Sequence, residues 1–270
     1  MRLKIMTWNI QGAASLVWNN QYKIKKDVVD KIICPKPKED VEADIIVLTE
    51  YVIAQGIDYL LDKFKEKGYI WMQQSRTGEN GILIAIKAEL VNQTLLKDEI
   101  YKSNIIQSNI QDCNLLEITF PLKNNKNICI LGCRLATGEK ELKQNYDEER
   151  KAFDEILLKY VNNMKQQELC IICGDFNNAR CLGNLNQKYN REDYKDKAQI
   201  NYNLNYIKDT FDGLGYQMAD CKEGNPIPTY KGYIPDDHIF VKGLSIENCD
   251  TVGAENLSAH DILIAECDIK

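Results

Sequence analysis

Polar side chains that can bind metal ions or phosphate groups lie at the ends of four apolar runs, which are spread along the whole chain. A strand that ends at such a residue delivers its side chain to the edge of a sheet. Amide, carboxylate and imidazole groups gathered at one edge suit metal-assisted hydrolysis of a phosphoester, because attack on phosphorus needs an oriented nucleophile and neutralised charge. The set is Asn9, Glu50, Asp175, Asn177, Asp237 and His260.

Each member also has a purely structural explanation when it is taken alone. Asn9 lies between a strand-like run and a glycine, which is typical of a turn asparagine. Glu50 closes the buried-strand pattern of residues 44–49 and Asp175 follows that of 169–173, where an acid can simply mark the solvated end of a strand. The same arrangement at three strand ends favours a shared site.

Five short segments, taken in order, resemble the motifs of the endonuclease/exonuclease/phosphatase family, the group of DNase I, abasic-site endonucleases, deadenylases and inositol-phosphate phosphatases. The resemblance covers nearly the whole chain. It implies an α/β (α+β) fold, a four-layer αββα sandwich of two packed mixed or antiparallel sheets, with helices outside and the site at one edge. The segments are Thr7-Trp8-Asn9-Ile10-Gln11-Gly12, Leu48-Thr49-Glu50, Gly174-Asp175-Phe176-Asn177, Thr229-Tyr230 with Asp237-His238-Ile239-Phe240-Val241, and Ser258-Ala259-His260.

The resemblance also implies a role for each residue of the first three segments. Glu50 is expected to hold a Mg²⁺ ion directly, with Asn9 close by, and hard oxygen ligands suit this ion, with Mn²⁺ as an alternative. Asp175 is expected to orient or deprotonate the attacking water. Asn177 is expected to contact the phosphate.

The last two segments imply an imidazole–carboxylate pair of His260 and Asp237. A carboxylate fixes the tautomer of a histidine and stabilises its imidazolium form. The register leaves Asp236 open as an alternative to Asp237. His238 lies inside an apolar run, so we expect a packed or substrate-side residue there and not a metal ligand. The identity of the general base stays open.

Two positions depart from the family pattern. Ala259 stands where the family has an aspartate, and the missing carboxylate predicts weaker metal binding or a slower reaction. Asp261 points away from His260 in an extended segment, so it can replace that carboxylate only if the local backbone differs. Arg134 stands where the family commonly has His or Tyr, and its permanent, bidentate charge makes it a candidate phosphate clamp. A solvated surface arginine is the alternative there.

The leading hypothesis is a Mg²⁺-dependent phosphohydrolase, a phosphodiesterase or nuclease that acts on a nucleic acid or a nucleotide-like substrate by in-line attack of water. One alternative is a phosphomonoesterase or headgroup phosphatase of the same fold. Another is a catalytically impaired binding module, with Ala259 as its symptom. The expected partner is a phosphate-ester substrate, with DNA and RNA as candidates, and nothing in the sequence indicates a protein partner.

The hydrophobic pattern shows the elements that must position these residues. Helix-period stripes are predicted over 22–33, 57–64 and 139–164, with a further helix through Tyr206 and Phe211. We expect one domain over 1–270, with a polar insertion around 182–208. The predicted strands are 3–8, 45–49, 81–86, 115–120, 128–133, 169–173, 238–241 and 262–267.

Bulk properties are ordinary for a globular protein of 270 residues, with 44% apolar and 27% charged residues. No stretch approaches the ~20 apolar residues of a membrane span. The N-terminal residues enter a strand-like pattern at once, so we expect a cytoplasmic protein. The net charge of −6 argues against a protein that coats nucleic acid by bulk electrostatics, but it leaves room for a local basic groove.

Ten cysteines and only two histidines are present. Most of the cysteines lie in or beside apolar runs, so we expect reduced, buried thiols that behave as small hydrophobes. Cys170 and Cys173 have C-x-x-C spacing, but residues three apart on a strand point to opposite faces. A zinc or redox site is therefore not expected.

Overall fold

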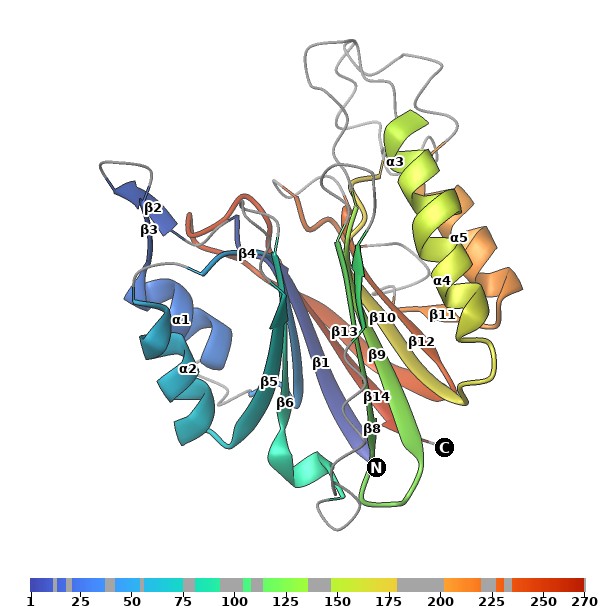
Figure 1. The fold of residues 1–270 in the computed structure, drawn as a ribbon, viewed down its shortest axis with the longest axis horizontal. Coiled ribbons are helices and arrows are strands. Elements are labelled where there is room, and N and C mark those ends of the chain that lie inside the picture. The colour runs from blue at the N-terminus through green and yellow to red at the C-terminus, as the bar shows by residue number, and fades with distance from the viewer. Residues whose placement is uncertain are drawn as a thin grey trace.

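Two six-stranded sheets pack face to face, and helices cover the outer surface of each, which gives four layers (Figure 1). This is the αββα arrangement expected from the sequence. The computed structural model describes residues 1–11, 14–17, 21–36, 42–53, 56–74, 81–92, 104–107, 114–135, 147–178, 202–219, 227–230 and 235–269.

The first sheet consists, in spatial order, of β13 (Leu244–Val252), β14 (Ile262–Ile269), β1 (Arg2–Asn9), β4 (Ile45–Tyr51), β6 (Gly81–Lys87) and β5 (Tyr69–Gln74). The central strands β1 and β4 are parallel, and the other neighbouring pairs are antiparallel. The carboxyl ends of β1 and β4 therefore reach the same edge, where the amino end of β14 also lies.

The second sheet repeats this plan. It consists, in spatial order, of β11 (Gln217–Met218), β12 (Asp237–Lys242), β10 (Leu169–Asp175), β9 (Asn127–Arg134), β8 (Asn114–Pro121) and β7 (Asn104–Gln107). Here β9 and β10 form the parallel central pair, and the other neighbours are antiparallel. The carboxyl ends of β9 and β10 thus lie beside the amino end of β12.

Helices cover the outer faces of both sheets (Figure 1). Apolar residues of α1 (Lys26–Ile33) and α2 (Ile57–Glu66) pack on the first sheet in one buried cluster. On the second sheet lie α3 (Asp147–Ala152), the π-helical segment η4 (Phe153–Leu157), α4 (Leu158–Asn163) and α5 (Leu204–Gly213). The smaller elements are the hairpin of β2 (Ala14–Val17) and β3 (Gln21–Ile24) and the 3-10 turn η2 (Ala88–Leu90).

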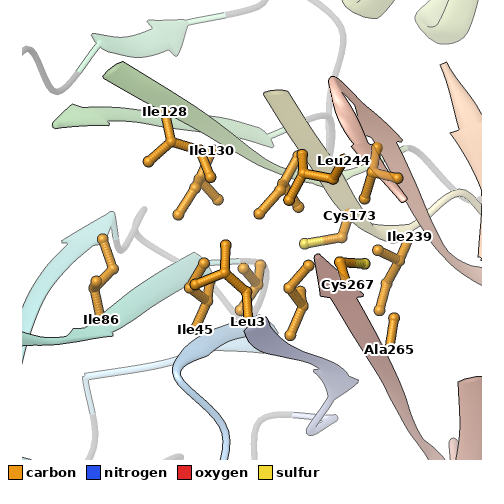
Figure 2. Packing of buried hydrophobic residues seen from close by; sticks show 14 of the residues in the cluster. Leu3, Ile45, Ile86, Ile128, Ile130, Cys173, Ile239, Leu244, Ala265 and Cys267 are labelled. Carbon is orange, nitrogen blue, oxygen red and sulfur yellow. The ribbon is translucent and has the colours of Figure 1, made fainter. Parts of the chain in front are cut away.

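The core between the sheets is aliphatic. Figure 2 shows Leu3, Ile45 and Ile86 of the first sheet facing Ile128 and Ile130 of the second. Side chains alternate along each strand, so the neighbouring positions of the central strands pack under the helices instead. Burial on both faces explains why these strands read as continuous apolar runs in the sequence. Each fully buried aliphatic side chain contributes about 1.5–3 kcal/mol to folding.

Most predicted elements are confirmed. The predicted strands are present as β1, β4, β6, β8, β9, β10, β12 and β14, and the helix predicted over 57–64 is α2. The prediction of a helix over 22–33 is wrong at its start, because Gln21–Ile24 pairs with β2 as a strand and α1 begins at Lys26. Tertiary pairing overrides the local helical period there.

The expectation of reduced cysteines is wrong at Cys249, which is disulfide-bonded. The described free cysteines are Cys34, Cys129, Cys133, Cys170, Cys173 and Cys267. Of the predicted long helix, 139–146 lie outside the described residues, as do 182–201 of the predicted insertion. In the described part of the chain, no helix has the length and apolar character needed to cross a membrane.

Candidate active site

Strand ends from both sheets meet at one edge of the sandwich, the upper edge in Figure 1. Asn9 at the end of β1 contacts Asp175 at the end of β10, and Glu50 in β4 contacts Arg134 at the end of β9. Asp237, the first residue of β12, is the register partner of Asp175. The parallel pair in each sheet brings these ends together.

Asp175 is held by amide groups on two sides. Its Oδ2 accepts hydrogen bonds from Asn9 Nδ2 at 2.7 Å and from Asn177 Nδ2 at 3.1 Å, and its Oδ1 accepts one from the Asn177 backbone N–H at 2.9 Å. Burial, and next the charge of Asp237, raise the pKa of the Asp175 carboxyl, while the charges of His260 and Arg134 act against the rise. The carboxylate is therefore oriented by donors in a site that resists negative charge.

His260 and Asp237 form the expected imidazole–carboxylate pair, with Nδ1 and Oδ2 2.7 Å apart. Burial alone would lower the pKa of His260, but the charge of Asp237, a hydrogen bond to it, and the more distant Asp175 and Asp236 raise the pKa to about 10. The imidazole is thus charged at neutral pH and donates to Asp237. Of the two registers, it is Asp237 whose carboxylate contacts the imidazole.

Groups around this pair fix both partners. Trp8 Nε1 donates to the His260 carbonyl at 2.8 Å, and the Tyr230 ring lies 4.8 Å from the imidazole ring, centroid to centroid. Thr229 Oγ1 accepts the Asp237 backbone N–H at 3.0 Å. Among the described residues, no group hydrogen-bonds to the buried Asp237 Oδ1.

Glu50 occupies a β-bulge. The pairing of β4 with β6 shifts register between Thr49 and Tyr51, and Glu50 has a φ of +52°. A bulge next to a site typically re-aims one side chain. Here the carboxylate reaches Arg134, whose Nη2 lies 3.1 Å from Glu50 Oε1 with a side chain only 5% exposed. The alternative of a solvated surface arginine at this position is therefore wrong.

Left-handed backbone conformations cluster at this edge. Besides Glu50, Gln11 has a φ of +45° and Asn177 a φ of +46°. Such conformations cost free energy in residues other than glycine and persist where the surroundings fix them. The Gln11 N–H donates to Asn9 Oδ1 at 2.9 Å, and Asn177 Nδ2 donates to the Leu135 carbonyl at 2.9 Å. These bonds hold the two turns in place.

The segment 258–260 is anchored although Ala259 offers no carboxylate. Ser258 Oγ donates to the Asn9 carbonyl at 2.7 Å and accepts the His260 backbone N–H at 3.1 Å. The Ala259 N–H donates to Gln11 Oε1 at 2.8 Å. Asp261 Oδ1 instead accepts the Ala254 N–H at 3.0 Å, so Asp261 serves the neighbouring turn and does not replace the missing acid.

His238 lies apart from the site, packed under the helices of the second sheet. Its Nε2 lies 2.7 Å from Asn178 Oδ1, and its ring centroid lies 5.2 Å from that of Phe176. Burial lowers the pKa of His238 to about 3, so the ring is neutral. The structure therefore places it as the packed residue expected from the sequence.

Two groups of side chains have the chemistry to hold a divalent metal. Glu50 and Asn9 carry oxygen ligands on adjacent strands, as the sequence led us to expect, and such ligands fit Mg²⁺. The ligand atoms of Asp175, Asp237 and His260 lie within 4.8 Å of one another. A protonated His260 bound to Asp237 is a poor ligand, because metal ligation requires a neutral imidazole. Glu50 with Asn9 is the better candidate.

Residues that the sequence did not assign to the site also support it. Gln11 braces both Asn9 and Ala259, and Thr229 holds the backbone of Asp237. Both residues lie inside the motif segments Thr7–Gly12 and Thr229-Tyr230, and this position was the only sign in the sequence that they belong to the site. The bond of Gln11 to Ala259 joins residues 248 positions apart and cannot be read from spacing, whereas Thr229 lies only 8 positions before Asp237.

No protein-family model and no curated protein matches the sequence. Among solved structures, TDP2 of D. rerio complexed with single-strand DNA product is 15% identical, with 99% of each chain covered and a TM-score of 0.62. The human Nocturnin catalytic domain with bound sulfate is 15% identical, with 100% of this chain and 94% of that chain covered and a TM-score of 0.62. An endonuclease/exonuclease/phosphatase from Beutenbergia cavernae DSM 12333 is 12% identical, with 99% and 72% covered and a TM-score of 0.63. This chain therefore has the DNase I-like fold of those proteins.

Proposed function

We propose that this chain is a divalent-metal-dependent phosphoester hydrolase, a phosphodiesterase or nuclease that acts on a nucleic acid or nucleotide-like substrate by in-line attack of water. One observation carries the proposal. Asp175, oriented by Asn9 and Asn177, lies at the same sheet edge as a charged His260–Asp237 pair. The edge thus combines an oriented acceptor for a water proton with cationic donors for phosphate oxygens.

The solved structures of the same fold support the substrate class. One is described with a single-strand DNA product and another with a sulfate anion. A DNA strand carries phosphodiester anions, and sulfate is a tetrahedral oxyanion like phosphate. We extend that ligand class to this chain as part of the proposal. We also propose a single domain over 1–270, because both sheets share one inner core. A cytoplasmic location stays a prediction.

Each residue has a proposed role that follows from its contacts. Glu50 and Asn9 would hold Mg²⁺ or Mn²⁺, which when bound supplies charge neutralisation at the phosphate. Oδ2 of Asp175 accepts two hydrogen bonds and Oδ1 accepts one, so Oδ1 can accept a further hydrogen bond from an attacking water. Asn177 and Arg134 would contact the phosphate.

His260 would present its Nε2 proton to the phosphate or the leaving oxygen, because its Nδ1 proton is engaged by Asp237. A permanently oriented imidazolium stabilises the negative charge that grows in the transition state.

The direct test is hydrolysis by the purified protein. Single-stranded and duplex DNA, RNA, dinucleotides and phosphate monoesters would be incubated with Mg²⁺, with Mn²⁺ and with EDTA. We expect metal-dependent cleavage of a diester that Asp175→Asn abolishes. If no phosphoester is cleaved with either metal, the proposal is wrong. Release of inorganic phosphate from monoesters alone would identify the phosphomonoesterase alternative.

Ala259 is the observation that favours a catalytically impaired binding module. Ala259→Asp restores a carboxylate beside His260 and should tighten Mn²⁺ binding, measured by calorimetry, because an added negative charge attracts the cation. We expect the wild type to turn over and the variant to turn over faster. If the wild type is inactive and the variant alone is active, the natural chain is a binding module.

A further inference from the structure

The Arg134–Glu50 ion pair joins the two sheets at the site. Arg134 ends β9 of the second sheet and Glu50 lies in β4 of the first, 84 positions away. The Nη2–Oε1 distance is 3.1 Å, and the side chains are 5% and 21% exposed. This largely buried ion pair differs from a surface salt bridge, because a buried charge without its partner would carry an uncompensated desolvation cost.

Glu50 cannot withdraw from this partner by a simple backbone shift. It is the extra residue of the bulge in β4, with a left-handed backbone. Its neighbours Thr49 and Tyr51 are fully buried, and the Tyr51 hydroxyl donates to Gln73 Oε1 at 2.6 Å. A cation that approaches this carboxylate therefore also approaches the guanidinium.

We propose that Arg134 is a built-in counter-cation for Glu50, so that the guanidinium and a divalent metal ion compete for one carboxylate. Opening of the ion pair admits the metal ion to Glu50 and frees the guanidinium to bind the substrate phosphate. This inference deepens the proposed function and rests on its placement of the metal at Glu50.

The charges at this edge support competition. Two cations, Arg134 and His260, lie at this edge among the carboxylates of Glu50, Asp175, Asp237 and the more distant Asp236, and position 259 supplies no further acid. Two cations that bind the same carboxylate, the guanidinium and the metal ion, repel each other, and this repulsion is strong in a buried site. Metal binding should therefore be weak in the free protein and become tighter when an anion takes up the guanidinium. By linkage, the metal should tighten anion binding by the same factor.

Calorimetric titration with Mn²⁺ tests the competition. Arg134→Gln removes the charge and is expected to bind Mn²⁺ ~10-fold more tightly than the wild type, which corresponds to about 1.4 kcal/mol. Arg134→Lys keeps the charge and should stay near the wild type. Arg150→Gln is the matched control, because it removes an arginine that pairs with Asp154 on the outer helices. It should leave Mn²⁺ binding unchanged.

Glu50→Gln separates failure of this inference from failure of the proposed function. If Glu50→Gln abolishes Mn²⁺ binding but Arg134→Gln binds no more tightly than the wild type, the competition is refuted while the metal site stands. If Mn²⁺ binding does not depend on Glu50 in any variant, both proposals fall. Inorganic phosphate should tighten Mn²⁺ binding in the wild type and do so much less in Arg134→Gln; equal tightening in both contradicts the release of the guanidinium.

A measurement on the wild type keeps the inference testable if Arg134→Gln does not fold. The side-chain N–H signal of Arg134 in a nitrogen-15 spectrum reports on its partner. Titration with diamagnetic Mg²⁺ should shift that signal to saturation, with the dissociation constant that calorimetry gives for Mg²⁺ itself. An unchanged Arg134 signal at saturating Mg²⁺ would show that the ion pair does not open.

Discussion

The two histidines of the chain show how neighbours decide the chemistry of one residue type. His260 faces the Asp237 carboxylate and is held as a cation. His238 lies among aromatic rings, bonded to the Asn178 amide, and stays neutral. Both are almost fully buried, so burial alone does not separate them. The presence or absence of a facing carboxylate does.

This contrast predicts different outcomes for two identical substitutions. His260→Gln should lower kcat by ~10²–10⁴-fold, because an acid–base group is lost from the transition state. His238→Gln can keep a hydrogen bond to Asn178 and should leave kcat within a few-fold of the wild type, which makes it the matched control. Steady-state rates on the best substrate, with thermal melting to verify folding, check both. Equal losses would argue that His260 acts only in folding.

Strand-end residues of the site were predictable because each follows or begins an apolar run within a short motif. The pairings between them were not. The contact of Glu50 with Arg134 and the bond of Gln11 to Ala259 depend on which strands become neighbours, and the bulge at Glu50 leaves no trace in local spacing. Composition and periodicity carry no information of that kind.

At the scale of elements, the same limit appears in the strands that the pattern did not reveal. β5 and β13 lie at the two edges of the first sheet, and β13 has two exposed polar residues, Glu247 and Asn248. An edge strand needs no continuous apolar run, whereas the central strands, buried on both faces, do. The central elements were therefore predictable and the edges were not.

The junction of β9 and β10 sets the position of the site through Gly174, and this contact yields a prediction. Gly174 has a φ of +142°, and an added Cβ would lie 1.9 Å from the Cys133 carbonyl oxygen. Gly174→Ala must therefore push apart the strands that end in Arg134 and Asp175. We expect a loss of at least about 4 kcal/mol in the free energy of unfolding, measured by urea denaturation.

Gly213→Ala is the control for this substitution. Gly213 ends α5, and an added Cβ would meet nothing within 4 Å. Alanine there should be neutral or stabilise by up to about 1 kcal/mol, because it limits the unfolded chain. Similar urea midpoints for the two variants would contradict the close approach of β10 to β9.

At the scale of the whole molecule, the site depends on both sheets, and it places buried charged groups at one edge of the sandwich. Asn9 and Glu50 come from one sheet, and Arg134, Asp175 and Asp237 from the other. Hydrogen bonds and an ion pair across the gap join them. The titration of buried groups is therefore linked to global unfolding.

The two histidines give this linkage opposite signs. The pKa of His260 is about 10 in the folded state, above its ordinary value of 6.5, so its stabilising contribution is complete below pH 6.5 and lost as the pH rises toward 10. The pKa of His238 is about 3, so its contribution is complete above pH 6.5 and lost as the pH falls toward 3. Titratable groups that do not interact with the substituted histidine add their own slopes, which cancel in the difference between wild type and variant.

The measurement is the free energy of unfolding of the metal-free protein, by urea at steps from pH 5 to pH 8.5. The free energy of unfolding of the wild type minus that of His260→Gln should fall by up to about 1.4 kcal/mol per pH unit above pH 6.5, because unfolding then releases one proton from His260. The corresponding difference for His238→Gln should instead fall as the pH decreases below 6.5. A His260 difference that stays flat across pH 6.5–8.5 would mean that Asp237 does not hold the imidazole in its charged form, and the cationic role proposed for His260 would have to be given up.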